Sequence, residues 1–239
     1  MRAIIRCTPV RNLIYTGGWA HPFERTAPVV ADVLAGAGVT SQITDCLATV
    51  RRALDLGNFD LLTVYACRFS MLDARYTDEQ RAEYAERMPL DVRRAIEAHV
   101  GRGGSLLALH TATLCFDDWP GWQQLIGGGW VWGQTFHPPV DVVTVDPVGE
   151  HPIMFEIEPF TVEDEHYRFL DVASAATVLA VTPSGGVAHP AMWTAGHRVF
   201  VDALGHDERS LMHPAHSTVL RRAARWLNGA IDAAVRAQT

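Results

Sequence analysis

Short apolar runs alternate with amphipathic segments along the first half of this chain. An apolar run of about four to eight residues bounded by turn residues is typical of a buried strand, whereas apolar positions three and four residues apart are typical of a helix. The alternation of the two favours a parallel, doubly wound sheet. The predicted strands are residues 3–7, 41–44, 60–65 and 105–109, and the predicted helices are residues 25–34, 47–56 and 77–100.

The helix predicted over residues 77–100 has the clearest boundaries. Thr77 is a candidate cap, acidic residues occupy the first turn, and GRGG follows the end. Pro89 lies inside this segment and predicts a kink or a division, because proline lacks the backbone donor that a helix interior needs.

The pattern changes in the second half, where mainly strands are predicted before an amphipathic C-terminal helix from about residue 217 to 237. These strands are residues 141–145, 160–170, 177–182, 191–195 and 197–204. No low-complexity linker and no internal repeat separates the two halves. We therefore expect a single domain over residues 1–239, in which the second half is a β-rich elaboration of the same sheet.

The stretch GGSLLALHTATLCF, Gly103–Phe116, combines a buried strand with small residues that could open a helix. In hydrolases and amidotransferases built on parallel sheets, the residue at the tip of such a turn is a Ser or Cys nucleophile. In this chain the tip is His110. An imidazole at that place predicts a general acid or base, a polar substrate contact or a metal ligand.

Histidines are the most informative residues of the chain, which has eleven of them. For a histidine that precedes proline an exposed turn is the favoured interpretation, and His99 and His197 are expected to be structural. Four histidines follow predicted strands or lie in loops above their ends, where the ligand crevice of an open parallel sheet is found. They are His21, His110, His137 and His206.

An acidic segment, VEDEHY, could bring Asp164 or Glu165 to the same crevice as a proton carrier, a ligand orienter or a metal ligand. The alternation of polar and apolar residues in this segment is explained equally well by a strand whose acidic face is exposed to solvent. Aromatic residues near these candidates could offer apolar faces to a sugar ring, although core packing is as good an interpretation for each. The tryptophans concerned are Trp19, Trp130, Trp132 and Trp193.

Composition and charge exclude some classes of function. The 239 residues are 48% hydrophobic and carry a formal net charge of −7, without the basic cluster that a nucleic-acid partner would need. No apolar run is long enough for a membrane span or a signal peptide, so a cytoplasmic protein without membrane contact is expected. The four cysteines have no CxxC spacing and are expected to be reduced thiols.

The chain resembles the ThuA-like, or trehalose-utilisation, proteins almost end to end. The resemblance rests on the order and spacing of GGWAHPFERTAPVVADVL, GRGGSLLALHTAT, LIGGGWV followed by FHP, EHPIMF, DEHY and HPAMWTAGHRVFVDALGH. It implies a flavodoxin-like α/β fold of the class I glutamine amidotransferase-like superfamily. Glutamine amidotransferases have a Cys nucleophile at the tip of this strand-to-helix turn, whereas this chain has His110, so no glutaminase activity is expected. Cys115 lies too far along the chain to replace that thiol.

The resemblance and the residues together predict a carbohydrate-processing enzyme. The expected substrate is a small glycoside or a 3-keto sugar, because histidines and carboxylates suit proton transfer next to a carbonyl. Val201–Ala203 and His166 depart from the family pattern, so the substrate could differ from trehalose derivatives. The expected catalytic residues are His110, His206, Asp164 and Glu165, and the expected substrate-binding residues are His21, Trp19, His137, Tyr167 and Trp193.

Three converging imidazoles, from His21, His110 and His206, would also suit a divalent metal such as zinc, although no compact motif of the HExxH type supports it. Two alternatives from other classes stay open. The protein could be a non-catalytic sugar-binding or regulatory protein, or a structural subunit that forms homo-oligomers through its β-rich half.

Overall fold

The structure is a computed structural model that describes residues 9–229. Its elements, in chain order, are β1 (Val10–Gly18), α1 (Phe23–Ala35), β2 (Val39–Thr44), α2 (Leu47–Asp55), β3 (Leu61–Cys67), α3 (Asp78–Tyr84), α4 (Leu90–Gly101), β4 (Ser105–Leu109), η1 (His110–Thr113), α5 (Pro120–Ile126), β5 (Gly128–Gly129), β6 (Asp141–Pro147), η2 (Pro152–Met154), β7 (Phe160–Asp164), β8 (Asp171–Val172), β9 (Thr177–Ser184), β10 (Val187–Ala195), β11 (Val199–Asp202), α6 (Glu208–Leu211) and α7 (Pro214–Leu227).

A nine-stranded sheet forms the centre of the molecule, in the order β2-β1-β3-β4-β11-β10-β9-β6-β7. Strands β2, β1, β3, β4 and β11 are parallel, and the four remaining strands join in antiparallel pairs. The expectation of an α/β protein with a large, mostly parallel central sheet is confirmed. Because the five parallel strands run in one sense, their carboxyl ends meet at one edge of the sheet.

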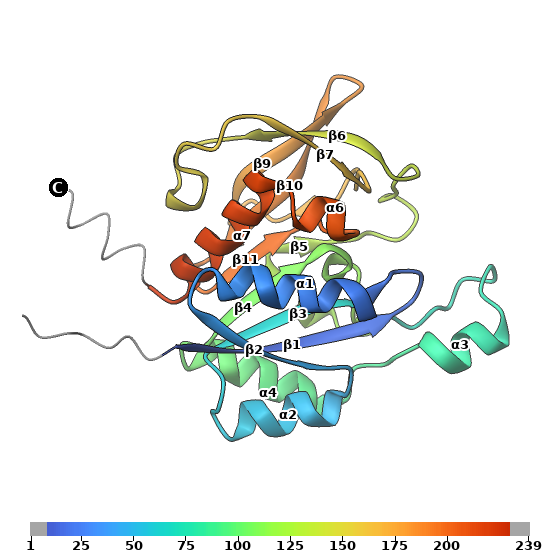
Figure 1. Ribbon diagram of the computed structural model, residues 1–239. Helices are drawn as coiled ribbons and strands as arrows, with labels where there is room; N and C mark the ends of the chain where they lie inside the picture. Colours follow the sequence, from blue (N-terminus) through green and yellow to red (C-terminus); the bar gives the residue numbers. More distant parts are fainter. Residues whose placement is uncertain (1–8, 230–239) are drawn as a thin grey trace, which may run out of the picture.

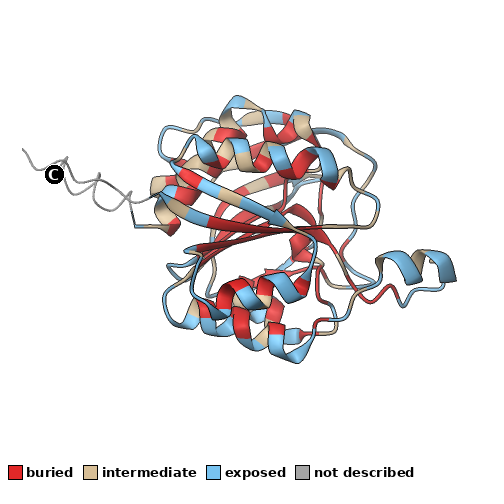
Figure 2. Cartoon of the chain, turned by 60° about the horizontal axis from the view of Figure 1, so that its bottom comes forward, coloured by how far each residue is buried: buried red, intermediate tan, exposed pale blue. Residues whose placement is uncertain are grey.

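Helices cover both faces of the parallel strands, with α1 and α7 on one side and α2 and α4 on the other (Figure 1). Strand β1 shows why both faces are apolar: Leu13 and Tyr15 belong to the core under α2 and α4, whereas Ile14 belongs to the core under α1 and α7. Figure 2 shows the resulting buried centre between helices whose outer faces are exposed. No helix of residues 9–229 has both the length and the apolar character that crossing a membrane requires.

Three sequence predictions need correction or fall outside the structure. The strand predicted at residues 3–7 lies outside the described residues, and the strand that precedes the first candidate loop is β1. That strand was missed because Arg11 and Asn12 interrupt its apolar run. Asn12 is nevertheless buried, since Thr63 donates to its side-chain oxygen at 2.9 Å and its amide donates to Ser41 at 3.1 Å.

The second correction concerns the strand predicted at 160–170, which ends at Asp164. The Asp164 carboxylate accepts the backbone N–H of Glu165 at 2.7 Å, and such a local side-chain bond competes with the sheet ladder. The third concerns the C-terminal helix, which begins at Pro214, earlier than predicted. Its predicted part from residue 230 onward lies outside the described residues.

Candidate metal centre and cavity

Four candidate side chains reach one place from the ends of strands that are far apart in the sequence. His21 follows β1, His110 follows β4, Glu165 follows β7 and His206 follows β11. The ring centroid of His21 lies 5.0 Å from those of His110 and His206, and the last two lie 5.8 Å apart. The common edge of the parallel strands therefore brings these imidazoles together, as the topology predicts.

His110 stands at the tip of the turn between β4 and the 3-10 helix η1. Its φ of 54° lies in the left-handed region, which is uncommon for a residue with a side chain and is typical of strained functional turns. The residue is fully buried, and its Nδ1 donates to the carbonyl of Ala203 at 3.0 Å. The turn is thus a nucleophile elbow in shape, with an imidazole in place of the nucleophile.

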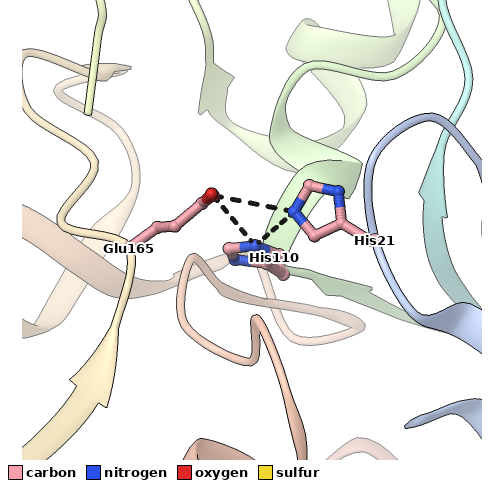
Figure 3. A group of neighbouring side chains, drawn as sticks. All are labelled: His21, His110 and Glu165. Carbon is pink, nitrogen blue, oxygen red and sulfur yellow. Dashed lines mark hydrogen bonds and ion pairs between the residues drawn. The ribbon is translucent and has the colours of Figure 1, made fainter. Parts of the chain in front are cut away.

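The Glu165 carboxylate lies next to every imidazole of the cluster, and Figure 3 shows it with His21 and His110. Its Oε2 lies 3.4 Å from Nε2 of His110 and 3.6 Å from Nε2 of His21. Its Oε1 lies 3.5 Å from Nε2 of His206 and 3.6 Å from Nδ1 of His137. One glutamate is therefore surrounded by four imidazoles, at distances longer than ordinary hydrogen bonds.

The hydrogen bonds of two rings decide which nitrogens are free. Nδ1 of His21 donates to the carbonyl of Trp19 at 2.9 Å, and Nδ1 of His110 donates to that of Ala203, since a carbonyl oxygen can only accept. In their neutral forms both rings then present an Nε2 lone pair, and these two atoms are 3.1 Å apart. Two lone pairs and a carboxylate oxygen converge, an arrangement that a shared proton or a cation stabilises.

The pKa directions agree with a site that favours positive charge. Burial raises the pKa of Glu165, but the neighbouring His110, His21 and His137 lower it by more, so the carboxylate stays ionised. Burial lowers the pKa of His110, and the nearby carboxylates of Glu165 and Asp164 raise it by more. By contrast, burial and His110 lower the pKa of His206, so that this ring is neutral near pH 7.

The donor set fits a divalent metal ion. His21, His110 and Glu165 each offer one ligand atom, and these atoms lie within 4.8 Å of one another. Tetrahedral zinc, with bonds of about 2.0–2.1 Å, separates its ligand atoms by about 3.3 Å, close to the distances between these three atoms. Glu165 Oε2 is also buried with no hydrogen-bond partner among the described residues, and a buried charged oxygen needs one. The rings of His21 and His110 each donate Nδ1–H to a backbone carbonyl. A metal-bound histidine typically makes such a hydrogen bond with the ring nitrogen that does not bind the metal.

A cavity of about 780 Å³ opens onto this cluster. Its lining includes His21, Glu165, His137 and Tyr167. Its wall is aromatic and its rings are in mutual contact, with Trp130 5.3 Å from Tyr167 and Trp132 5.3 Å from Phe69. The remaining aromatic lining residues are Trp19, Tyr76 and Phe136.

Two of the expected site residues lie elsewhere. Trp193 is fully buried in the core and donates its Nε1–H to the carbonyl of Ile126 at 2.8 Å, so it offers no face to a sugar. Asp164 is fully buried as well and is not among the residues that line the cavity. The other expected residues lie at the cluster or on the cavity wall. Tyr167 is one of them: its ring is stacked on His110 at 4.9 Å, and its hydroxyl lies 3.2 Å from Nε2 of that residue.

His99 and Cys115 have the structural environments expected of them. Nε2 of His99 donates to the carbonyl of Ser105 at 3.1 Å in a buried position. The Cys115 thiol is buried and donates to the carbonyl of Ala66 at 2.9 Å, and burial raises the pKa of this thiol well above its ordinary value. A thiol in that state is a poor nucleophile.

Sequence reasoning missed the central place of Glu165. It treated Asp164 and Glu165 as equivalent and assigned the third imidazole to His206, whereas the compact ligand set contains Glu165 with His21 and His110. The position at which β7 ends distinguishes the roles of the two acidic residues. Asp164 is the last residue of β7, and Glu165 is the first residue free to turn toward the edge.

Fold and site together define an α/β protein whose parallel strands end at a histidine cluster around one glutamate, and this cluster could hold a metal ion. More particularly, the chain belongs to the trehalose utilisation (ThuA) family, whose model matches residues 11–227. The resemblance found in the sequence is thereby confirmed. No curated protein matches the chain.

Solved structures of similar fold cover nearly the whole chain. A ThuA-like protein of Parabacteroides merdae ATCC 43184 has a TM-score of 0.73 at 17% identity, covering 92% of this chain and 90% of its own. A ThuA-like protein of Bacteroides uniformis ATCC 8492 has a TM-score of 0.67 at 16% identity, and the match covers 93% of this chain and 92% of that protein. A cytoplasmic protein of Salmonella typhimurium LT2 has a TM-score of 0.64 at 13% identity, and the match covers 90% of this chain and 99% of that protein. At these identities the likeness concerns the fold.

Proposed function

We propose that this protein is a carbohydrate-processing enzyme that uses a divalent metal, most simply zinc, at His21, His110 and Glu165. The single observation that carries the proposal is the convergence of the two Nε2 lone pairs and the Glu165 carboxylate at 3.1–3.6 Å, next to a cavity that His21 and Glu165 line. The family description, trehalose utilisation, supports a sugar as the substrate class. The cytoplasm is the proposed compartment.

The substrate proposed is a small glycoside or a 3-keto sugar. A divalent ion at this site would supply Lewis-acid polarisation of a sugar oxygen. We assign the role of proton acceptor to His206, because its partly exposed ring lies 3.5 Å from the Glu165 carboxylate and burial holds its pKa below the ordinary value. His137 lines the cavity, and the contact that we assign to it is with a sugar hydroxyl. The aromatic wall offers apolar faces to the ring.

Metal analysis combined with a proton-exchange assay tests this function. The purified protein should contain about one zinc or similar divalent ion per chain, because the three ligands form one site. With the metal bound, it should exchange the protons next to the carbonyl of a 3-keto-disaccharide for solvent deuterium, or convert that sugar, as seen by NMR. A protein that binds the sugar without exchange or conversion would instead be a sugar-binding or regulatory protein.

A first prediction concerns glutaminase activity. Incubation with glutamine should release no ammonia above the background, because His110 replaces the elbow nucleophile and the Cys115 thiol is buried and protonated. A coupled ammonia assay on the wild type and on Cys115→Ala measures this. Ammonia release that disappears in the variant would contradict the prediction.

A second prediction concerns the cavity wall. Trp132→Ala should weaken the binding of a disaccharide such as trehalose by about 5–10-fold, since one stacked aromatic ring contributes about 1 kcal/mol. The melting temperature should change little, because 42% of Trp132 is exposed. Phe155→Ala is the matched control: Phe155 is 64% exposed and is not among the residues that line the cavity. Calorimetric titration compares the three proteins, and equal weakening by both variants would refute a role for the wall.

A further inference from the structure

Asp164 occupies a buried position directly behind the cluster, where its carboxylate accepts four hydrogen bonds. Oδ1 accepts the backbone N–H of Glu165 at 2.7 Å and that of His206 at 3.3 Å. Oδ2 accepts the backbone N–H of Gly205 at 2.7 Å and the hydroxyl of Ser210. A single carboxylate thus joins the two loops that bear two of the site residues.

The Gly205–His206 loop is held from its other side as well. The Tyr65 hydroxyl donates to the carbonyl of Gly205 at 2.7 Å. Gly205 has a φ of +114°, a conformation that side chains disfavour, so the chain turns here because it can do so without a Cβ. The direction in which His206 enters the site therefore depends on the acceptor that fixes this turn, which is Asp164.

Asp164 is itself held by a chain of buried polar side chains that runs to helix α7. The Ser210 hydroxyl donates to Asp164 and lies 3.1 Å from Nδ1 of His216. Nε2 of His216 donates to the Asp202 carboxylate at 2.8 Å, and Nδ1 donates to the Ser210 carbonyl at 2.9 Å. All four side chains are fully buried.

Burying such a network is costly, and an apolar core of equal volume would often be as stable. Its hydrogen bonds instead end on the backbone of Glu165 and His206. The outer partners that orient metal ligands commonly act in this way, by fixing the direction of a ligand without touching the metal. Loss of such a partner typically lowers metal affinity about 10–100-fold.

We infer that Asp164 is a positioning residue, held by Ser210 and His216, that sets the orientation of Glu165 and His206. It thus does not act as the proton carrier that its sequence position suggested. The inference rests on the proposed metal site for its consequence, although the loop order that it predicts exists without metal. Ser210 is the position for the test, because Ser210→Ala removes one hydroxyl and leaves every site residue in place.

The experiment compares Ser210→Ala with Ser105→Ala. Both serines are buried and each hydroxyl donates one hydrogen bond, that of Ser105 to the carbonyl of Leu227 at 2.6 Å, remote from the cluster. Cobalt(II) is the probe, since it takes the ligands of zinc and reports their geometry in its visible spectrum. Ser210→Ala should weaken cobalt binding about 10-fold and shift that spectrum, whereas Ser105→Ala should do neither. Asp164→Asn should have a larger effect in the same direction.

Backbone hydrogen exchange on the metal-free protein gives the second readout. The amides of Gly205 and His206 should exchange about 10-fold faster in Ser210→Ala than in Ser105→Ala, because their acceptor is less firmly held. Unchanged exchange at these two amides overturns the inference, whatever the metal does. Equal changes in cobalt affinity for the two serine variants overturn it as well. A wild type that binds no cobalt refutes the metal in the proposed function, and the exchange result then decides the positioning role by itself.

Discussion

Replacing Glu165 with glutamine is expected to abolish stoichiometric zinc binding and to weaken residual binding by about 1,000-fold, well beyond the effect of an outer partner. The reason is that the carboxylate supplies the only negative charge in the ligand set of His21, His110 and Glu165. A glutamine keeps the shape but loses the charge. Calorimetric titration of the metal-free protein with zinc, together with elemental analysis, measures the loss.

The matched control is Glu163→Gln. Glu163 lies on β7, two residues before Glu165, but it is exposed and pairs with Arg209 at the surface. This variant should bind zinc as the wild type does. Folding of Glu165→Gln is checked by circular dichroism, so that a lost site is separated from a lost fold. Zinc bound at one equivalent by Glu165→Gln would remove the glutamate from the centre and, with it, the metal part of the proposed function.

The proposed proton acceptor is tested by His206→Ala. Replacing His110 instead would give a less specific test. His110 is fully buried, and both its ring nitrogens lie near polar partners, so its removal would also disturb the core. His206 is partly exposed and belongs to the cluster without being one of the three compact ligands. Its loss should therefore abolish proton exchange on the substrate while zinc stays bound.

The residue pattern was sufficient to predict the features that depend on short-range order. The apolar run 105–109 corresponds to strand β4 over its full length. The predicted helix is divided as the proline suggested, since Pro89 directly precedes α4, although α3 already ends at Tyr84. The place of His110 at the turn followed from the same run. Parallel strands ending at one edge then explain why His21, His110 and His206 meet.

Other features depend on contacts between distant segments, which no local pattern records. Strand β1 contains Asn12, whose burial is possible only because Thr63 and Ser41 on neighbouring strands bond to it. Trp193 and Trp130 are both buried, but only Trp130 also lines the cavity. The two acids of the DEHY segment differ only in which of them the strand end releases toward the site.

The second large effect concerns stability and the buried His216–Asp202 pair. His216→Gln should lower the free energy of unfolding by about 3 kcal/mol near pH 6, because it leaves the Asp202 carboxylate buried without its cation. Burial lowers the pKa of His216, but Asp202 raises it by more, so its pKa in the folded protein is above the ordinary value. Urea unfolding followed by circular dichroism measures the difference.

The sign of the pH dependence follows from that raised pKa. Between the unfolded pKa of about 6.5 and the higher folded pKa, the folded state binds more protons than the unfolded state. The stabilisation by His216 is therefore complete below about pH 6.5 and is lost as the pH rises through the folded pKa. In His216→Gln this alkaline loss should disappear, so that the gap in unfolding free energy between variant and wild type narrows as the pH rises above about 6.5.

His99→Gln is the control with the opposite sign. Burial lowers the pKa of His99, whose Nε2 donates to the Ser105 carbonyl, so its contribution is present above about pH 6.5 and is lost as the pH falls through the folded pKa. That variant should therefore approach the wild type on the acidic side, where His216→Gln is furthest from it. If both variants followed the wild-type pH profile at a constant offset, His216 would be neutral in the folded protein. The buried Asp202 carboxylate would then be held by hydrogen bonds alone, without an ion pair.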